Sequence, residues 1–181
     1  MKKVIIFHGT GGTPDSFWHP YIKEKLEAMG YDVKVPALPN SDNPVIADQL
    51  TFALENFTYD ENTILIGHSA GVPLILSILE RINVKALQSI FVAGFFEPID
   101  PPEPEPMLQE SYDWSTINEH CKNFIVINSD DDPWGCTDVV GWKLAQNVSG
   151  KFILAKGQGH MGSLKFNQPY KEFPLLLELV V

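Results

Sequence analysis

The sequence predicts an α/β fold built on a doubly wound, mostly parallel sheet of about six strands. Short apolar runs rich in β-branched and aromatic residues alternate with longer segments whose apolar residues recur at helical spacing. This alternation is typical of buried parallel strands connected by helices. The length of 181 residues is enough to bury a substantial core, so we expect residues 1–181 to form one domain.

The first half of the sequence predicts three strands and three helices. A strand is expected at 4–7, and the helix after it ends at Gly30, a common helix stop. A short strand at 31–35 leads through a turn-rich stretch to a helix whose apolar face runs from 45 to 57. The third strand, 63–66, is followed by a helix that extends to Ile82.

The second half of the sequence predicts three further strands. Strands are expected at 89–92, 124–127 and 152–155, with helices between the last two and after Pro169. Connections between parallel strands should be right-handed, which places helices on both faces of the sheet.

Charge and composition exclude several classes of protein. The chain has 13 Lys and Arg against 23 Asp and Glu, a formal net charge of −10, which argues against nucleic acid and anionic membranes as partners. The hydrophobic fraction of 44% excludes a disordered chain, and the apolar stretches are too short to span a bilayer. Cys121 and Cys136 are too few for a disulfide framework and no signal peptide opens the sequence, so we expect a cytoplasmic protein with free thiols.

One acidic, proline-rich segment, residues 97–107, breaks the alternation. Five prolines exclude a helix or a central strand there. Most such stretches are solvated linkers, but this one leaves the carboxyl end of a strand, where ligands bind in open parallel sheets. We slightly favour a flap over a pocket.

The strongest functional motif is Gly67-His68-Ser69-Ala70-Gly71, a G-x-S-x-G sequence between a strand and a helix. In this context the motif predicts a nucleophile elbow, a sharp turn that lifts the serine oxygen clear of the sheet. The amide of Ala70, at the positive end of the following helix, would face a developing oxyanion.

A serine nucleophile needs a base, and in this scaffold an acid and then a histidine follow the serine along the chain. Among the five histidines we select His160, in a glycine-rich loop directly after the last strand. His8 and His19 precede the serine, His68 points away from the elbow, and His120 lies at the wrong edge of the sheet.

The acid is expected in the run Asp130-Asp131-Asp132-Pro133 after the strand at 124–127. The proline restricts the backbone before it, so Asp132 is the first choice, Asp131 the alternative and Asp130 a brace of the turn. A hard cation on three aspartates and a histidine is a weaker hypothesis, because contiguous carboxylates are usually turn formers. We expect neither a metal nor a cofactor.

A second oxyanion donor should come from the glycine-rich loop that follows the first strand, and we assign it to the amide of Thr10. The loop lacks the lysine of a P-loop and the glycine spacing of a dinucleotide site. Aromatic and sulfur side chains expected near the pocket are Phe95, Phe96, Trp114, Trp134 and Met161.

With these motifs in place, the chain resembles α/β-hydrolases, and more narrowly the small serine hydrolases of the retinoblastoma-binding-protein and YdeN type. The resemblance covers nearly the whole length and rests on residues 67–71, 129–133 and the pair Gly159-His160. It implies a three-layer fold, an esterase-like activity on small substrates and Asp132 as the acid. From the length of the chain we expect no separate cap domain. It also lacks the Leu-x-Cys-x-Glu peptide of the retinoblastoma-binding member, so that partner is not transferred, and Gly135-Cys136 departs from the usual pattern.

These observations predict a serine hydrolase that cleaves a small carboxylic ester, thioester or amide through an acyl-Ser69 intermediate. The alternative is a non-catalytic protein-binding module on the same fold. The acidic stretches near the site lead us to expect neutral or cationic esters over anionic ones.

Overall fold

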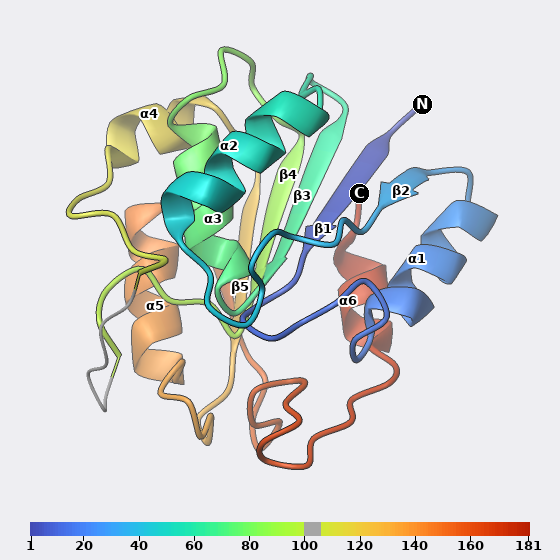
Figure 1. Cartoon of the computed structure of the whole chain (residues 1–181), viewed down its shortest axis with the longest axis vertical. Helices are drawn as coiled ribbons and strands as arrows, with labels where there is room; N and C mark the ends of the chain where they lie inside the picture. Colours follow the sequence, from blue (N-terminus) through green and yellow to red (C-terminus); the bar gives the residue numbers. More distant parts are fainter. Residues whose placement is uncertain (100–105) are drawn as a thin grey trace.

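The computed structural model describes residues 1–99 and 106–181 and contains one six-stranded sheet (Figure 1). All strand pairs are parallel, in the order β2-β1-β3-β4-β5-β6. The strands are β1 (Lys3–Phe7), β2 (Asp32–Lys34), β3 (Thr63–His68), β4 (Gln88–Val92), β5 (Phe124–Asn128) and β6 (Lys151–Leu154). The predicted fold class is confirmed, and the predicted strand ends differ from these by at most two residues.

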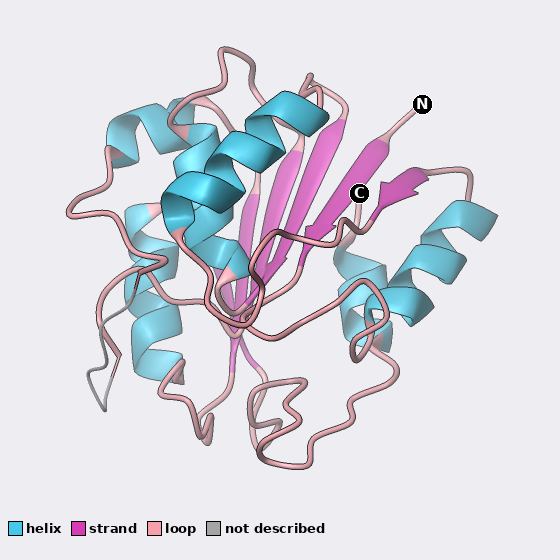
Figure 2. Cartoon of the chain, viewed as in Figure 1, coloured by secondary structure: helices cyan, strands magenta, loops and turns pink. Residues whose placement is uncertain are grey.

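Helices cover both faces of the sheet, which gives the three layers seen in Figure 2. They are α1 (His19–Ala28), α2 (Ile46–Asn56), α3 (Gly71–Leu79), α4 (Trp114–Glu119), α5 (Asp138–Asn147) and α6 (Pro174–Leu179). Helices α1 and α6 pack against each other beside β1 and β2, whereas α3 lies on the opposite face between α2 and α4 (Figure 1). No separate cap domain is present among the described residues.

The most apolar segments of the sequence form the centre of this arrangement. Every residue of β3 and of α3 is buried, because the sheet covers one side of α3 and its neighbouring helices cover the others. The strand and the helix that flank the G-x-S-x-G motif are therefore both held in the packed core.

The sheet reverses its winding direction between β1 and β3. From β1 the chain moves to β2 on one side, and from β3 it proceeds outward in the other direction. Phe7 at the end of β1 is paired with Gly67 near the end of β3, so the loops that leave these strands start side by side. Such a switch point is where open α/β sheets bind ligands.

The proline-rich segment predicted as a flap lies mostly outside the described residues, which resume at residue 106. Its described ends are anchored: Glu97 forms an ion pair of 2.7 Å with Lys143, and the Pro106 carbonyl accepts a hydrogen bond of 3.0 Å from the Ile46 amide. Met107 is fully buried.

Both cysteines are buried and unbridged. None of the helices described for this chain has the length and apolar character that a membrane crossing requires.

Candidate active site

Ser69 lies on a sharp turn between β3 and α3. Its φ angle of 53° is in the left-handed region that a non-glycine residue rarely adopts. The turn is held by the Ser69 amide, which donates to the Val92 carbonyl at 2.9 Å, and by close backbone packing. A Cβ on Gly71 would collide with the Phe7 carbonyl, and one on Gly9 would lie 2.7 Å from the Ser69 Cβ. The glycines thus let the first-strand loop pass directly beside the serine.

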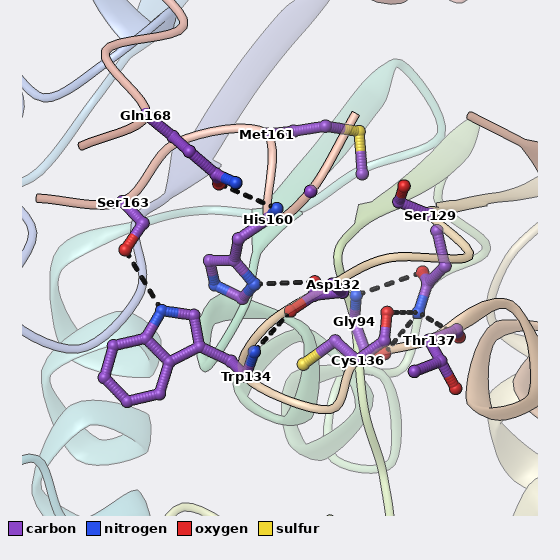
Figure 3. A network of polar contacts seen from close by, with 12 residues as sticks. Gly94, Ser129, Asp132, Trp134, Cys136, Thr137, His160, Met161, Ser163 and Gln168 are labelled. Carbon is purple, nitrogen blue, oxygen red and sulfur yellow. Dashed lines mark hydrogen bonds and ion pairs between the residues drawn. The ribbon is translucent and has the colours of Figure 1, made fainter. Parts of the chain in front are cut away.

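His160 and Asp132 are in direct contact (Figure 3). Nδ1 of His160 donates to Oδ2 of Asp132 at 2.7 Å, and the Asp132 side chain is completely buried. The second oxygen, Oδ1, accepts from the Trp134 amide at 2.8 Å, so both carboxylate oxygens have partners. With its proton on Nδ1, the imidazole leaves Nε2 able to accept one.

The other two aspartates of the run bind the backbone of the loop that carries His160. Oδ1 of Asp130 accepts from the Gly157 amide, and Oδ1 of Asp131 accepts from the Gly159 amide, both at 2.8 Å. A bond of 2.6 Å from the Ser129 hydroxyl, together with the Gly159 amide, lowers the pKa of Asp131. The runner-up acid therefore does not contact the His160 ring, and Asp130 braces the loop.

Two residues that the sequence analysis did not single out hold the same region in place. Oε1 of Gln168 accepts from the His160 amide at 2.9 Å, and a side chain on Gly159 would overlap the Gln168 amide group. The side-chain amide of Asn128, at the end of β5, donates to the carbonyls of Gly94 and Cys136, both at 2.9 Å. Asn128 can be noticed in the sequence because it is a polar residue at the end of an apolar strand. No local signal indicates Gln168.

The two histidines next to the motif glycines are structural. His68 donates from Nε2 to the His160 carbonyl at 2.9 Å, and burial, followed by the neighbouring histidines, lowers its pKa well below the usual value. His8 accepts from the Leu38 amide at Nε2 and donates from Nδ1 to the Gly9 carbonyl at 2.9 Å. Burial lowers the pKa of His8 too, so both rings are neutral and connect loops by hydrogen bonds.

The proposed oxyanion donors flank the serine. Thr10 follows Gly9 in the loop beside Ser69, and Ala70 follows Ser69 at the start of α3. In the described part of the chain no group accepts a hydrogen bond from either amide. Two amide donors are therefore available next to the Ser69 side chain.

A cavity of about 570 Å³ opens at this point, and its wall includes Thr10, Ser69 and His160. Phe95 and Trp134 line it as predicted, together with Ile99 from the edge of the proline-rich segment. The predictions for Phe96, Trp114 and Met161 were wrong: the first two rings pack against each other with centroids 5.4 Å apart, and Met161 is buried outside the lining. The structure has no hydrogen bond between Ser69 and His160 within the described residues.

One group of side chains has the composition of a metal site. Donor atoms of Asp132, Cys136 and His160 lie within 4.8 Å of one another, and all three residues are buried. The set differs from the three-aspartate site considered from the sequence, since Asp130 and Asp131 bind backbone amides instead. In this structure the carboxylate and the imidazole of the group bind each other.

Comparison with known proteins confirms the family that the sequence predicts. A family model described as serine hydrolase matches residues 4–179. The putative hydrolase YdeN of Bacillus subtilis is 34% identical over 135 residues, which cover 72% of this chain and 71% of that protein. Serine hydrolase RBBP9 of Rattus norvegicus is 25% identical over 178 residues, or 92% of this chain and 90% of that protein. The crystal structure of the B. subtilis ydeN gene product superposes with a TM-score of 0.88 at 29% identity, covering 99% and 96% of the two chains.

Proposed function

The chain belongs to the serine hydrolase family, and from this premise we propose that it hydrolyses a small carboxylic ester through an acyl-Ser69 intermediate. The observation that carries the proposal is the 2.7 Å hydrogen bond between His160 and Asp132. His160 and Ser69 line the same cavity. Serine, acid and histidine also follow one another along the chain in the order this scaffold requires.

In the proposed first step, Ser69 Oγ attacks the carbonyl carbon of the ester while His160 Nε2 takes the Oγ proton. The resulting imidazolium is stabilised by the carboxylate of Asp132. The carbon–oxygen bond to the alcohol then breaks, and the proton passes from Nε2 to the leaving alcohol. The products of this step are the free alcohol and acyl-Ser69.

Deacylation reverses the proton path with water as the nucleophile. Water attacks the acyl carbon as Nε2 takes its proton, and the proton then returns to Ser69 Oγ as the acid is released. In both steps the negative charge on the carbonyl oxygen would be held by the amides of Thr10 and Ala70. Their lack of a described acceptor supports this assignment.

The cavity favours a small substrate. Its volume of about 570 Å³ lies within the range for sites that bind drug-sized molecules, and no separate cap covers it in the described chain. Thioesters and amides undergo the same chemistry, and of the three the amide needs the most assistance to its leaving group.

A fluorophosphonate probe tests the function directly, because it phosphonylates a serine only when a neighbouring base activates it. The wild-type protein should be labelled and should hydrolyse 4-nitrophenyl butyrate, and Ser69→Ala should do neither. Ser129→Ala is the matched control and should retain labelling at Ser69. Equal labelling of Ser69→Ala would refute Ser69 as the nucleophile, and a wild type that resists the probe would favour a binding module on a hydrolase fold.

A further inference from the structure

The described wall of the cavity carries one formal charge. Of its described residues, Lys165 alone has a Lys, Arg, Asp or Glu side chain. Two histidines of the wall, His19 and His68, add none at neutral pH, since burial lowers the pKa of His19 to about 4 and that of His68 well below its usual value. The electrostatic character of the site therefore depends strongly on this lysine.

The position of the Lys165 ammonium is defined by Trp134. Nζ lies over the indole ring, 4.5 Å from its centroid, in a cation–π contact. Lys165 forms no ion pair with a carboxylate in residues 1–99 or 106–181. It is exposed, so its charge is available to a ligand at the mouth of the cavity.

A second donor lies at the edge of the same indole. Ser163 is 5% exposed and lines the cavity. Its Oγ accepts a hydrogen bond from Trp134 Nε1 at 3.1 Å (Figure 3). It also accepts one from the Phe166 amide at 3.4 Å. Because both of these groups are donors, the Ser163 hydroxyl must direct its own proton elsewhere, and no described group accepts it.

The backbone fixes the two donors relative to each other and to the base. Reciprocal hydrogen bonds of 3.0 and 2.8 Å between Ser163 and Gln168 close the loop that carries Lys165. The Trp134 ring centroid lies 6.3 Å from that of His160. The Lys165 ammonium therefore lies within about 11 Å of the centre of the His160 ring.

We infer that Ser163 and Lys165, arranged around Trp134, form a subsite for a carboxylate at the end of the substrate remote from the scissile ester. The ammonium and a hydroxyl proton together suit an anionic oxygen group and offer nothing to a cationic one. This inference rests on the proposed function and reverses the expectation drawn from the acidic sequence, because Asp130 and Asp131 bind backbone amides and lie outside the described cavity wall.

Two chromogenic esters that differ only in charge test the subsite. One is the mono-4-nitrophenyl ester of adipic acid, which ends in a free carboxylate, and the other is 4-nitrophenyl methyl adipate. The quantity to measure is the ratio of kcat/KM for the anionic ester to that for the neutral ester, after subtraction of spontaneous hydrolysis. Lys165→Met should lower this ratio roughly tenfold and Ser163→Ala severalfold, since each removes one contact to the carboxylate.

Lys171→Met is the matched control, because it removes the same charge from an exposed lysine outside the cavity wall. It should leave the ratio unchanged. A ratio that Lys165→Met leaves unaltered, or that both lysine variants lower equally, overturns the subsite while the esterase activity stands. Hydrolysis of neither ester by the wild type overturns the proposed function and this inference with it.

Discussion

Replacing Asp132 by Asn tests the assignment of the acid most sharply. The substitution keeps the size of the side chain but removes a buried charge that lies 2.7 Å from Nδ1 of His160. An opposite charge at about 3–4 Å, with an effective dielectric constant of about 20, stabilises the imidazolium by roughly 4–6 kcal/mol. We therefore expect kcat/KM for 4-nitrophenyl butyrate to fall by about 10³- to 10⁴-fold, with a parallel fall in the rate of fluorophosphonate labelling.

Asp131→Asn is the matched control, since it removes the same charge from the adjacent position. The oxygen of an asparagine can still accept from the Ser129 hydroxyl and the Gly159 amide, so we expect at most about a tenfold loss. Circular dichroism should show that both variants fold. A larger loss from Asp131→Asn than from Asp132→Asn, or less than a tenfold loss from Asp132→Asn, would refute the assignment.

Two further predictions concern the loop of the base and the buried histidines. Gln168→Ala removes the acceptor of the His160 amide, so it should lower kcat about tenfold while KM changes little. Gln168→Glu keeps an acceptor oxygen and should retain most of the wild-type rate. An equal loss of kcat in both variants would exclude a role of Gln168 in positioning His160. Burial lowers the pKa of His19 to about 4 in the folded protein, from a usual value of 6.5, so between these values the unfolded chain binds more protons. The free energy of unfolding should therefore fall as the pH is lowered from 6.5 towards 4, by up to about 1.4 kcal/mol per pH unit for this residue, and His19→Gln should flatten the slope in urea titrations.

The sheet and the elbow were predictable because their signals are local. The strands are apolar runs, and the motif around Ser69 combines a strand, a turn with two glycines and a helix within a few residues. The contact between Asp132 and His160 was also predictable, although 28 residues separate them, since both follow strands that end at the same edge of a parallel sheet.

The rim of the cavity was not predictable in the same way. The loop from Ser163 to Gln168 has no periodic pattern and is closed by two backbone hydrogen bonds, so its shape depends on tertiary packing. The role of Gln168 arises from its approach to Gly159, and that of Lys165 from its position over Trp134. Aromatic residues near strand ends did not reliably identify the lining of the cavity, because the rings of Phe96 and Trp114 pack against each other.

The arrangement of the three consecutive aspartates connects the catalytic loop to the charge of the cavity. Adjacent carboxylates repel one another, and here each is compensated by a different donor: the Gly157 amide for Asp130, the Gly159 amide for Asp131 and the His160 ring for Asp132. The run thus contacts the His160 loop at three points, and the charges of Asp130 and Asp131 are directed towards its backbone. A site in an acidic protein can in this way present a lysine as the only Lys, Arg, Asp or Glu side chain on the described cavity wall, and under the inferred subsite the charge of the substrate depends on the rim residues more than on the net charge of −10.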